Sequence, residues 1–289
     1  MIAGPATFAW LLLAAQLLIF GTAAFALMTP AMASRASATF QRRVAAMWRA
    51  LALVVLAISP LAFMDMACGM AQMRWWRVVA LVPEILRETD AGRAWRWRFA
   101  TVAILAAAAW IPLRARTAAI AMLALTAVLL LLTSITGHAI DFGRFAIAVY
   151  FAHQAGAGLW LGALAALLLG CADEPERAQW IRAVTPRVSA LAASAVGILV
   201  VTGLFTAYER IGWDLHLMID AMYGRTLLWK LATFGVVLVL AAYSRLRIVS
   251  RLDEASAREI LIRNVAAECV VLAAVLGWSA MLANTPPPH

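Results

Sequence analysis

Long apolar stretches, separated by short polar segments, recur along the whole chain. Each stretch is long enough to cross the ~30 Å hydrocarbon core of a bilayer as an α-helix. The stretches are continuous rather than alternating, which argues against a transmembrane β-barrel. The pattern predicts an all-α, polytopic membrane protein with a single domain over residues 1–289. Its eight transmembrane helices are expected at Phe8–Met32, Val44–Met64, Trp97–Ile111, Ala118–Thr136, Phe145–Cys171, Val188–Tyr208, Thr226–Tyr243 and Ile262–Ala283.

One further segment, Arg74–Glu88, mixes apolar and charged positions. It contains WWRVV and LVPEIL, and Pro83 interrupts it. The segment is too short and too charged for a span, so we expect a short interfacial helix. The pair Trp75 and Trp76 is expected at the level of the lipid headgroups, where tryptophan is enriched.

Composition agrees with a membrane protein, because 65% of the residues are apolar and only 13% are charged. A soluble domain carries about a quarter charged residues. The net charge of +9 comes from 23 arginines and one lysine. Arginines gather in the predicted loops on one side of the membrane, at Ala33–Arg43, Pro112–Thr117, Ala172–Arg187 and Ser244–Leu261. Positively charged loops face the cytoplasm, so both termini are expected on the outer side of the membrane.

An internal repeat relates the two halves of the chain. GRAWRWRFAT at Gly92–Thr101 matches GRTLLWKLAT at Gly224–Thr233, with Arg98 opposite Lys230. Each half, about 1–138 and 139–289, then holds four spans. An even number keeps the orientation, so the sequence predicts two parallel four-helix repeats related by an axis along the membrane normal. A further alignment, AAQLLIFG with FAHQAGAG, places Gln16 opposite His153.

Sulfur side chains gather in PLAFMDMACGMAQM, at the outer end of the second predicted span. The segment contains Met64, Met66, Met70 and Met73, together with Asp65 and Cys68. Thioether and thiolate ligands suit Cu(I), whereas methionine is also an ordinary filler of apolar gaps. Metal binding and packing both stay open. On a helix, Met66 and Met70 are neighbours that can share one ion, and Met73 would extend the same stripe.

Three histidines also lie on or near the predicted outer side. His138 is expected to close the fourth helix, His153 lies about nine residues into the fifth, and His216 lies in the loop ERIGWDLHLMIDAMYG. Imidazole is a ligand for copper, zinc and haem iron. A hydrogen bond between helices is the alternative role for His153, and a solvated loop residue is the alternative for His216.

Other functional motifs are not found in the sequence. It has no Walker loop, GxSxG, HExxH or dinucleotide fingerprint, so we expect a protein that is not an enzyme. The one acid deep in the last span, Glu268, has two possible roles. Pairing with Arg245 or Arg263 is favoured over a role in a proton path.

The combination TGHA, H-x2-GAGLWLGAL, YGRTLLWK, RNVAAE and TPPP, from about Glu88 to Pro288, resembles the inner-membrane copper resistance protein D family (CopD/PcoD). The resemblance implies eight transmembrane helices and copper movement across the bacterial inner membrane, usually discussed as uptake. It also implies copper ions as the transported species and a periplasmic copper-binding partner of the CopC type. His138 and His153 occupy positions that match histidines of the family. The methionine cluster matches no family motif.

Two alternative functions stay open at this point. One is a membrane haem protein of the cytochrome b type, with His138 and His153 as axial ligands, and a Soret band would reveal it. The other is a membrane assembly factor that binds no metal.

Overall fold

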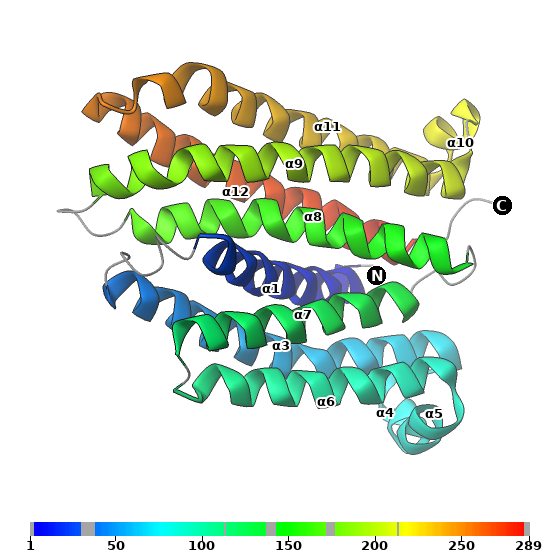
Figure 1. Ribbon diagram of the computed structural model, residues 1–289. Helices are drawn as coiled ribbons and strands as arrows, with labels where there is room; N and C mark the ends of the chain where they lie inside the picture. The colour runs from blue at the N-terminus through cyan, green and yellow to red at the C-terminus, as the bar shows by residue number, and fades with distance from the viewer. Residues whose placement is uncertain are drawn as a thin grey trace.

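The computed structural model describes residues 3–29, 38–112, 114–136, 143–171, 177–212 and 214–285, and these residues contain helices and no strand (Figure 1). The long helices are α1 (Ala3–Met28), α3 (Ala38–Ala71), α6 (Asp90–Trp110), α7 (Ala115–Thr136), α8 (Gly143–Gly170), α9 (Arg177–Ile211), α11 (Met222–Tyr243) and α12 (Ala255–Ala283). The short ones are α4 (Trp75–Val78), η1 (Val79–Leu81), α5 (Val82–Glu88), α10 (Leu215–Asp220), η3 (Ser244–Ile248) and η4 (Val249–Arg251).

Among the described residues, seven helices are long and apolar enough to cross a membrane: α1, α3, α7, α8, α9, α11 and α12. Helix α6 occupies the place of the expected third span, and it packs against α3 and α7 along the bundle (Figure 1). Its first half carries Asp90, Arg93, Arg96 and Arg98, so its continuous apolar part begins only at Phe99. A crossing by α6, which would make eight spans, stays a prediction.

Several helices extend beyond the apolar stretches that predicted them. Helix α3 continues seven residues past Met64, and α9 begins eleven residues before Val188 and includes Pro186. Arginines that were expected in loops, among them Arg42, Arg43, Arg182 and Arg187, therefore lie on helices. Hydrophobicity marks the part of a helix inside the hydrocarbon, whereas backbone hydrogen bonding continues into the polar flanks.

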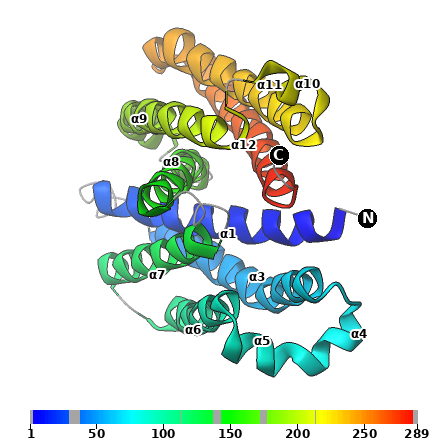
Figure 2. The same cartoon turned by 90° about the vertical axis from the view of Figure 1, so that its right-hand side faces the viewer.

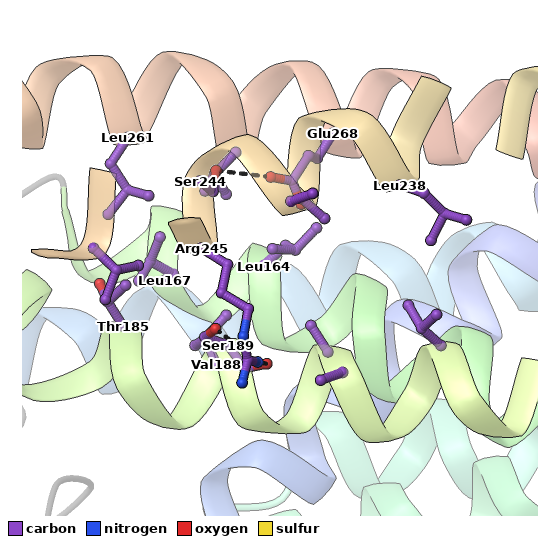
Figure 3. A pocket seen from close by; sticks show the side chains of 17 residues that line it. Leu164, Leu167, Thr185, Val188, Ser189, Leu238, Ser244, Arg245, Leu261 and Glu268 are labelled. Carbon is purple, nitrogen blue, oxygen red and sulfur yellow. Dashed lines mark hydrogen bonds between the residues drawn. The ribbon is translucent and has the colours of Figure 1, made fainter. Parts of the chain in front are cut away.

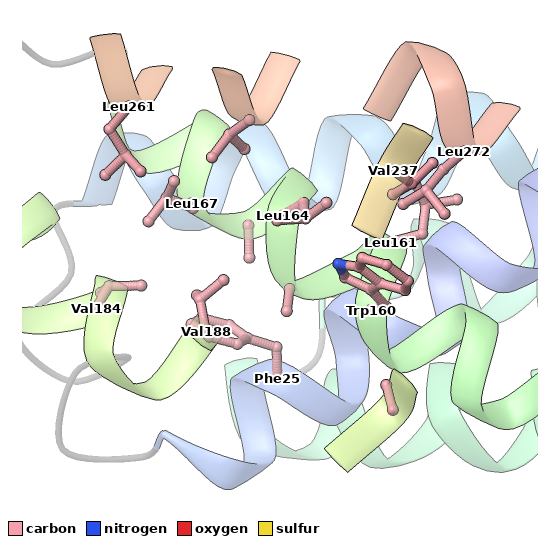
Figure 4. Packing of buried hydrophobic residues seen from close by; sticks show 14 of the residues in the cluster. Phe25, Trp160, Leu161, Leu164, Leu167, Val184, Val188, Val237, Leu261 and Leu272 are labelled. Carbon is pink, nitrogen blue, oxygen red and sulfur yellow. The ribbon is translucent and has the colours of Figure 1, made fainter. Parts of the chain in front are cut away.

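The long helices form two groups with α1 and α8 at the centre. Helix α1 packs against α3, α7, α8 and α12, and α8 packs mainly against α1, α9 and α7. Figure 2 shows α1 crossing the middle of the bundle, with α3, α6 and α7 on one side and α9, α11 and α12 on the other. The largest buried cluster surrounds Trp160 of α8, and its neighbours come from α1, α9, α11 and α12 (Figure 4).

Glycines allow α1 and α8 to approach closely. A Cβ atom on Gly21 would collide with the backbone of Gly158 and Gly162, and one on Gly162 would collide with the backbone of Gly21. This is the close approach that small residues permit between membrane helices. Gly156 faces α9 instead, next to Ile198 and Leu199, so Gly156, Gly158 and Gly162 serve two contacts.

The two copies of the GR motif adopt the same local structure. Gly92 packs against the carbonyl group of Ile85, and Gly224 packs in the same way against the carbonyl of Leu217. In each copy the residue seven positions upstream lies in a short helix, α5 or α10, that folds back onto the long helix. Thr101 and Thr233 each donate a hydrogen bond of 2.8 Å to the carbonyl four residues earlier. The local repeat is thus structural, and the symmetry of the whole halves stays a prediction.

Candidate functional site

His153 of α8 is partly buried, and its side chain faces α9. Its Nδ1 atom is 2.8 Å from Oγ1 of Thr202. The Thr202 hydroxyl lies 2.5 Å from the carbonyl oxygen of Ile198, to which it donates its only proton. Thr202 must therefore accept a hydrogen bond from Nδ1–H of His153, which leaves the lone pair on Nε2. The imidazole is held by one nitrogen and offers the other.

This arrangement is the one that metal-binding histidines use. A ligating imidazole usually donates its second N–H to a neighbouring acceptor, which fixes the ring and its tautomer. Within the described part of the chain, Nε2 of His153 forms no hydrogen bond. The Cε1 atom of the ring faces Gly203, whose missing side chain leaves room beside the imidazole.

Lys230 shares the depth of this histidine. His153 lies ten residues after the start of α8, Thr202 nine before the end of α9, and Lys230 eight after the start of α11. At 1.5 Å per residue these positions are about 12–15 Å from the helix ends. The Lys230 ammonium interacts electrostatically with His153. Arg98, the counterpart of Lys230 in the repeat, is buried, and its guanidinium lies 4.5 Å from the centre of the Trp95 ring.

Further polar contacts hold the same half of α8. The Gln154 amide donates to Oγ of Ser134 on α7 at 2.9 Å. One turn away, Arg210 of α9 donates to the Tyr150 hydroxyl through Nε and Nη2, at 3.1 and 2.8 Å. Gln16, the residue aligned with His153, is only 2% exposed, and its Nε2 finds no acceptor among the described residues. His153 therefore lies in a polar layer that crosses several helices.

The methionine cluster lies at the C-terminal end of α3. Met64, Met66 and Cys68 pack against a small core formed by Phe63, Ala67, Val78, Ile85 and Trp95. That core joins α3 to α4, α5 and α6. Met64, Met66 and Cys68 thus have a packing role. Metal binding by Asp65, Met66, Cys68 and Met70 stays a prediction.

The stripe of methionines along α3 ends earlier than expected. The helix stops at Ala71, Gln72 has a positive φ of 52°, and Met73 N–H donates to the Cys68 carbonyl. This is a Schellman-type end, so the expectation that Met73 continues the helical stripe is wrong. Met70 and Met73 are 50% and 46% exposed, which leaves both thioethers accessible.

The other candidate ligands are placed apart. His216 is exposed on α10, where its backbone N–H donates to the Asp214 carboxylate. Helix α10 and the pair α4 and α5 lie at the same end of the bundle but at opposite edges (Figures 1 and 2), so His216 is separated from the methionine cluster. His138 lies outside the described residues. In the described ranges, no three His, Cys, Asp or Glu side chains gather closely enough to hold a metal ion.

The fold and these side chains define a multi-pass helical membrane protein with a partly buried imidazole and a group of sulfur donors at the end of one helix. The chain belongs to the copper resistance protein D family. Residues 182–282 match the family description "Copper resistance protein D", and residues 3–143 match "Copper resistance protein D-like, N-terminal domain".

Two relatives agree with this assignment. Copper resistance protein D of Pseudomonas syringae pv. tomato is 29% identical over 255 residues, which cover 82% of each chain. Copper transport protein CutJ of Bacillus subtilis (strain 168) is 31% identical over 165 residues, which are 55% of this chain and 29% of that protein. No solved structure matches the chain.

Proposed function

We propose that the protein moves copper ions across the bacterial inner membrane, in the direction of uptake from the periplasm. The observation that carries this proposal is the oriented imidazole of His153, with Nδ1–H held by Thr202 and Nε2 free for a metal. An ionisable side chain inside a membrane bundle is expensive, and it is typical of an ion pathway. The names of both relatives refer to copper.

The sulfur donors at the end of α3 provide an entry site in this proposal. Met70 is half exposed, Met66 lies one turn deeper, and Cys68 lies between them in the sequence. Soft ligands favour Cu(I) over harder cations. Copper captured there would pass to the imidazole of His153. His138 and His216 are further candidate ligands in this proposal.

The orientation follows from the arginines, which we propose to face the cytoplasm. Both termini, the methionine cluster and α10 then face the periplasm. A periplasmic copper-binding protein of the CopC type would deliver the ion at that surface. The protein acts in this proposal as a transporter rather than an enzyme.

Replacement of His153 by alanine tests the proposal directly. We expect the variant to insert normally and to lose copper accumulation in cells, because no other described side chain offers an imidazole at that depth. Loss of the interhelical hydrogen bond alone would cost only about 0.6–2 kcal/mol and leave transport largely intact. Accumulation equal to the parent would remove His153 from the pathway.

Purified protein distinguishes the transport function from the haem-protein and assembly-factor alternatives. Metal analysis and an optical spectrum of the parent protein would show a Soret band if the protein held haem. A sample that neither contains nor binds copper would favour the assembly-factor role and would contradict the proposed function.

A further inference from the structure

A cavity separates α9 from α11 at the end of the bundle opposite to the methionine cluster. Its volume is about 250 Å³, and residues of α8, α9, α11, η3 and α12 line it (Figure 3). Most of the lining is aliphatic. Its hydrogen-bonding side chains are Thr185, Ser189, Ser244, Arg245 and Glu268. One water molecule takes up roughly 30 Å³ in the liquid, so the cavity has room for several near these groups.

Glu268 is the buried acid of this cavity, and its partners are neutral. It is 2% exposed, and its Oε1 accepts hydrogen bonds from Ser244 at 3.1 Å and from Asn264 at 3.0 Å. The expectation that Glu268 pairs with Arg245 or Arg263 is wrong for Arg245, whose Nη1 donates to the carbonyl and hydroxyl of Ser189 at 3.1 and 3.3 Å. The described residues place no ion pair on the carboxyl group.

The network leaves one oxygen of the carboxyl group unused. The Asn264 amide contacts the Leu240 carbonyl and the Ser244 hydroxyl as well as Oε1. Asn264 and Ser244 therefore both serve Oε1 and not Oε2. No hydrogen bond reaches Oε2 from the described residues. An ionised carboxylate inside a membrane bundle is costly without a cation, and a proton on Oε2 removes that cost.

Three further features point to exchange with one side of the membrane. Arg245 is exposed and lines the same cavity, so the cavity reaches the surface where α11 ends. Thr185, 4% exposed, also lines it, and its hydroxyl has no hydrogen-bond partner in the described chain. The segment Ser244–Ile248 is a π-helical turn, a rare geometry that is frequent at functional sites.

The other charged and titratable groups near Glu268 are few. Arg245 is the only other charged residue among those that line the cavity, and Cys269 on the same helix interacts electrostatically with the carboxyl group. The residues that α8 contributes, Leu164 and Leu167, are aliphatic, and those of α9 carry at most hydroxyl groups. Helix α1, which also packs against α12, contains no titratable residue in its described length.

We propose that Glu268 is a proton-binding site, reached from the cytoplasmic side through this cavity, and that the protein exchanges a proton there as it moves copper. The coupling rests on the proposed transport function, whereas proton binding does not. The step is a simple exchange: the carboxyl O–H bond on Glu268 breaks, the proton passes to water in the cavity, and the carboxylate keeps the electron pair.

Infrared difference spectroscopy of the purified, reconstituted full-length protein tests proton binding by itself. Spectra recorded in acidic and alkaline buffer should differ by a carboxylic-acid C=O band that is lost in Glu268→Gln. The glutamine keeps the shape of the side chain and an oxygen for Ser244. Glu259→Gln is the matched control, because Glu259 is on the same helix but pairs with Arg177 at the surface. A difference band equal in parent and E268Q would overturn the proposal.

Copper flux into vesicles, with a pH-sensitive dye inside, tests the coupling. We expect copper movement in the parent to depend on the pH gradient, and E268Q to lose the copper-linked proton signal while E259Q keeps it. Copper movement in the parent that ignores the gradient would overturn the coupling and leave transport standing. A parent that moves no copper would contradict the proposed function, and the infrared band would then decide the proton site alone.

Discussion

Removal of the Thr202 hydroxyl probes the tautomer of His153 without touching the imidazole. Valine has nearly the shape of threonine but cannot accept the bond from Nδ1–H. Without that acceptor the ring can rotate or move its proton to Nε2, the atom proposed to bind copper. Loss of such an outer partner typically lowers metal affinity by about 10–100-fold, which is about 1.4–2.7 kcal/mol of binding free energy.

The effect on folding should be smaller than the effect on binding. Interhelical hydrogen bonds in membrane proteins contribute about 0.6 kcal/mol on average, so Thr202→Val should insert and unfold nearly like the parent. Competition with a chromogenic Cu(I) chelator on the purified protein measures the affinity. Thr202→Ser retains the hydroxyl and should restore binding.

Thr206→Val supplies the matched control. Thr206 lies one turn further along α9 and donates only to the carbonyl of Gly203 in its own helix, at 3.0 Å. Its replacement should leave copper affinity unchanged. If Thr202→Val binds Cu(I) within about twofold of the parent, a difference below roughly 0.4 kcal/mol, the argument from the tautomer is refuted.

Three other predictions concern packing, the entry site and orientation. Gly21→Ala should lower the stability in detergent by about 1–3 kcal/mol, because the new methyl group meets the backbone of α8. The control Gly235→Ala, where nothing lies within 4 Å, should leave the thermal midpoint unchanged or raise it. A thermal midpoint of Gly21→Ala equal to that of the parent would contradict the packing argument. The double change Met66→Leu and Met70→Leu should weaken Cu(I) binding and leave Zn(II) binding nearly unchanged, with Met47→Leu on the same helix as control; unchanged Cu(I) binding would show that the cluster only packs. Reporter fusions at the C-terminus should be active in the periplasm, and activity confined to the cytoplasm would reverse the orientation.

The helices could be predicted because each one is a local property of the chain. A run of some twenty apolar residues in hydrocarbon must satisfy its backbone internally, and an α-helix does so within the segment. Seven of the predicted spans accordingly coincide with helices long and apolar enough to cross a membrane. Helix α6 shows the limit of the rule. The sequence predicted a span at Trp97–Ile111, but the charged first half of the helix leaves only a short apolar stretch, although α6 packs with α3 and α7.

Polar partners could not be predicted in the same way. Glu268 bonds to Ser244 and Asn264 rather than to an arginine, and the guanidinium of Arg98 lies buried over the Trp95 ring. Sequence indicates which polar residues lie within the bundle, but their partners come from other helices. The choice among them depends on the rotation of each helix about its axis.

Sequence alone determined that this is a helical membrane protein of the copper resistance protein D family, and it singled out His153 and the sulfur cluster. Tertiary structure alone decided that Thr202 of α9 holds the imidazole and that Met73 leaves the helical stripe. It also placed α10, which carries His216, at the opposite edge of the bundle from the helices α4 and α5 that pack on the methionine cluster (Figure 2). The physical reason is that hydrophobicity sets which segments enter the membrane, whereas close packing at glycines such as Gly21 and Gly158 sets which faces meet.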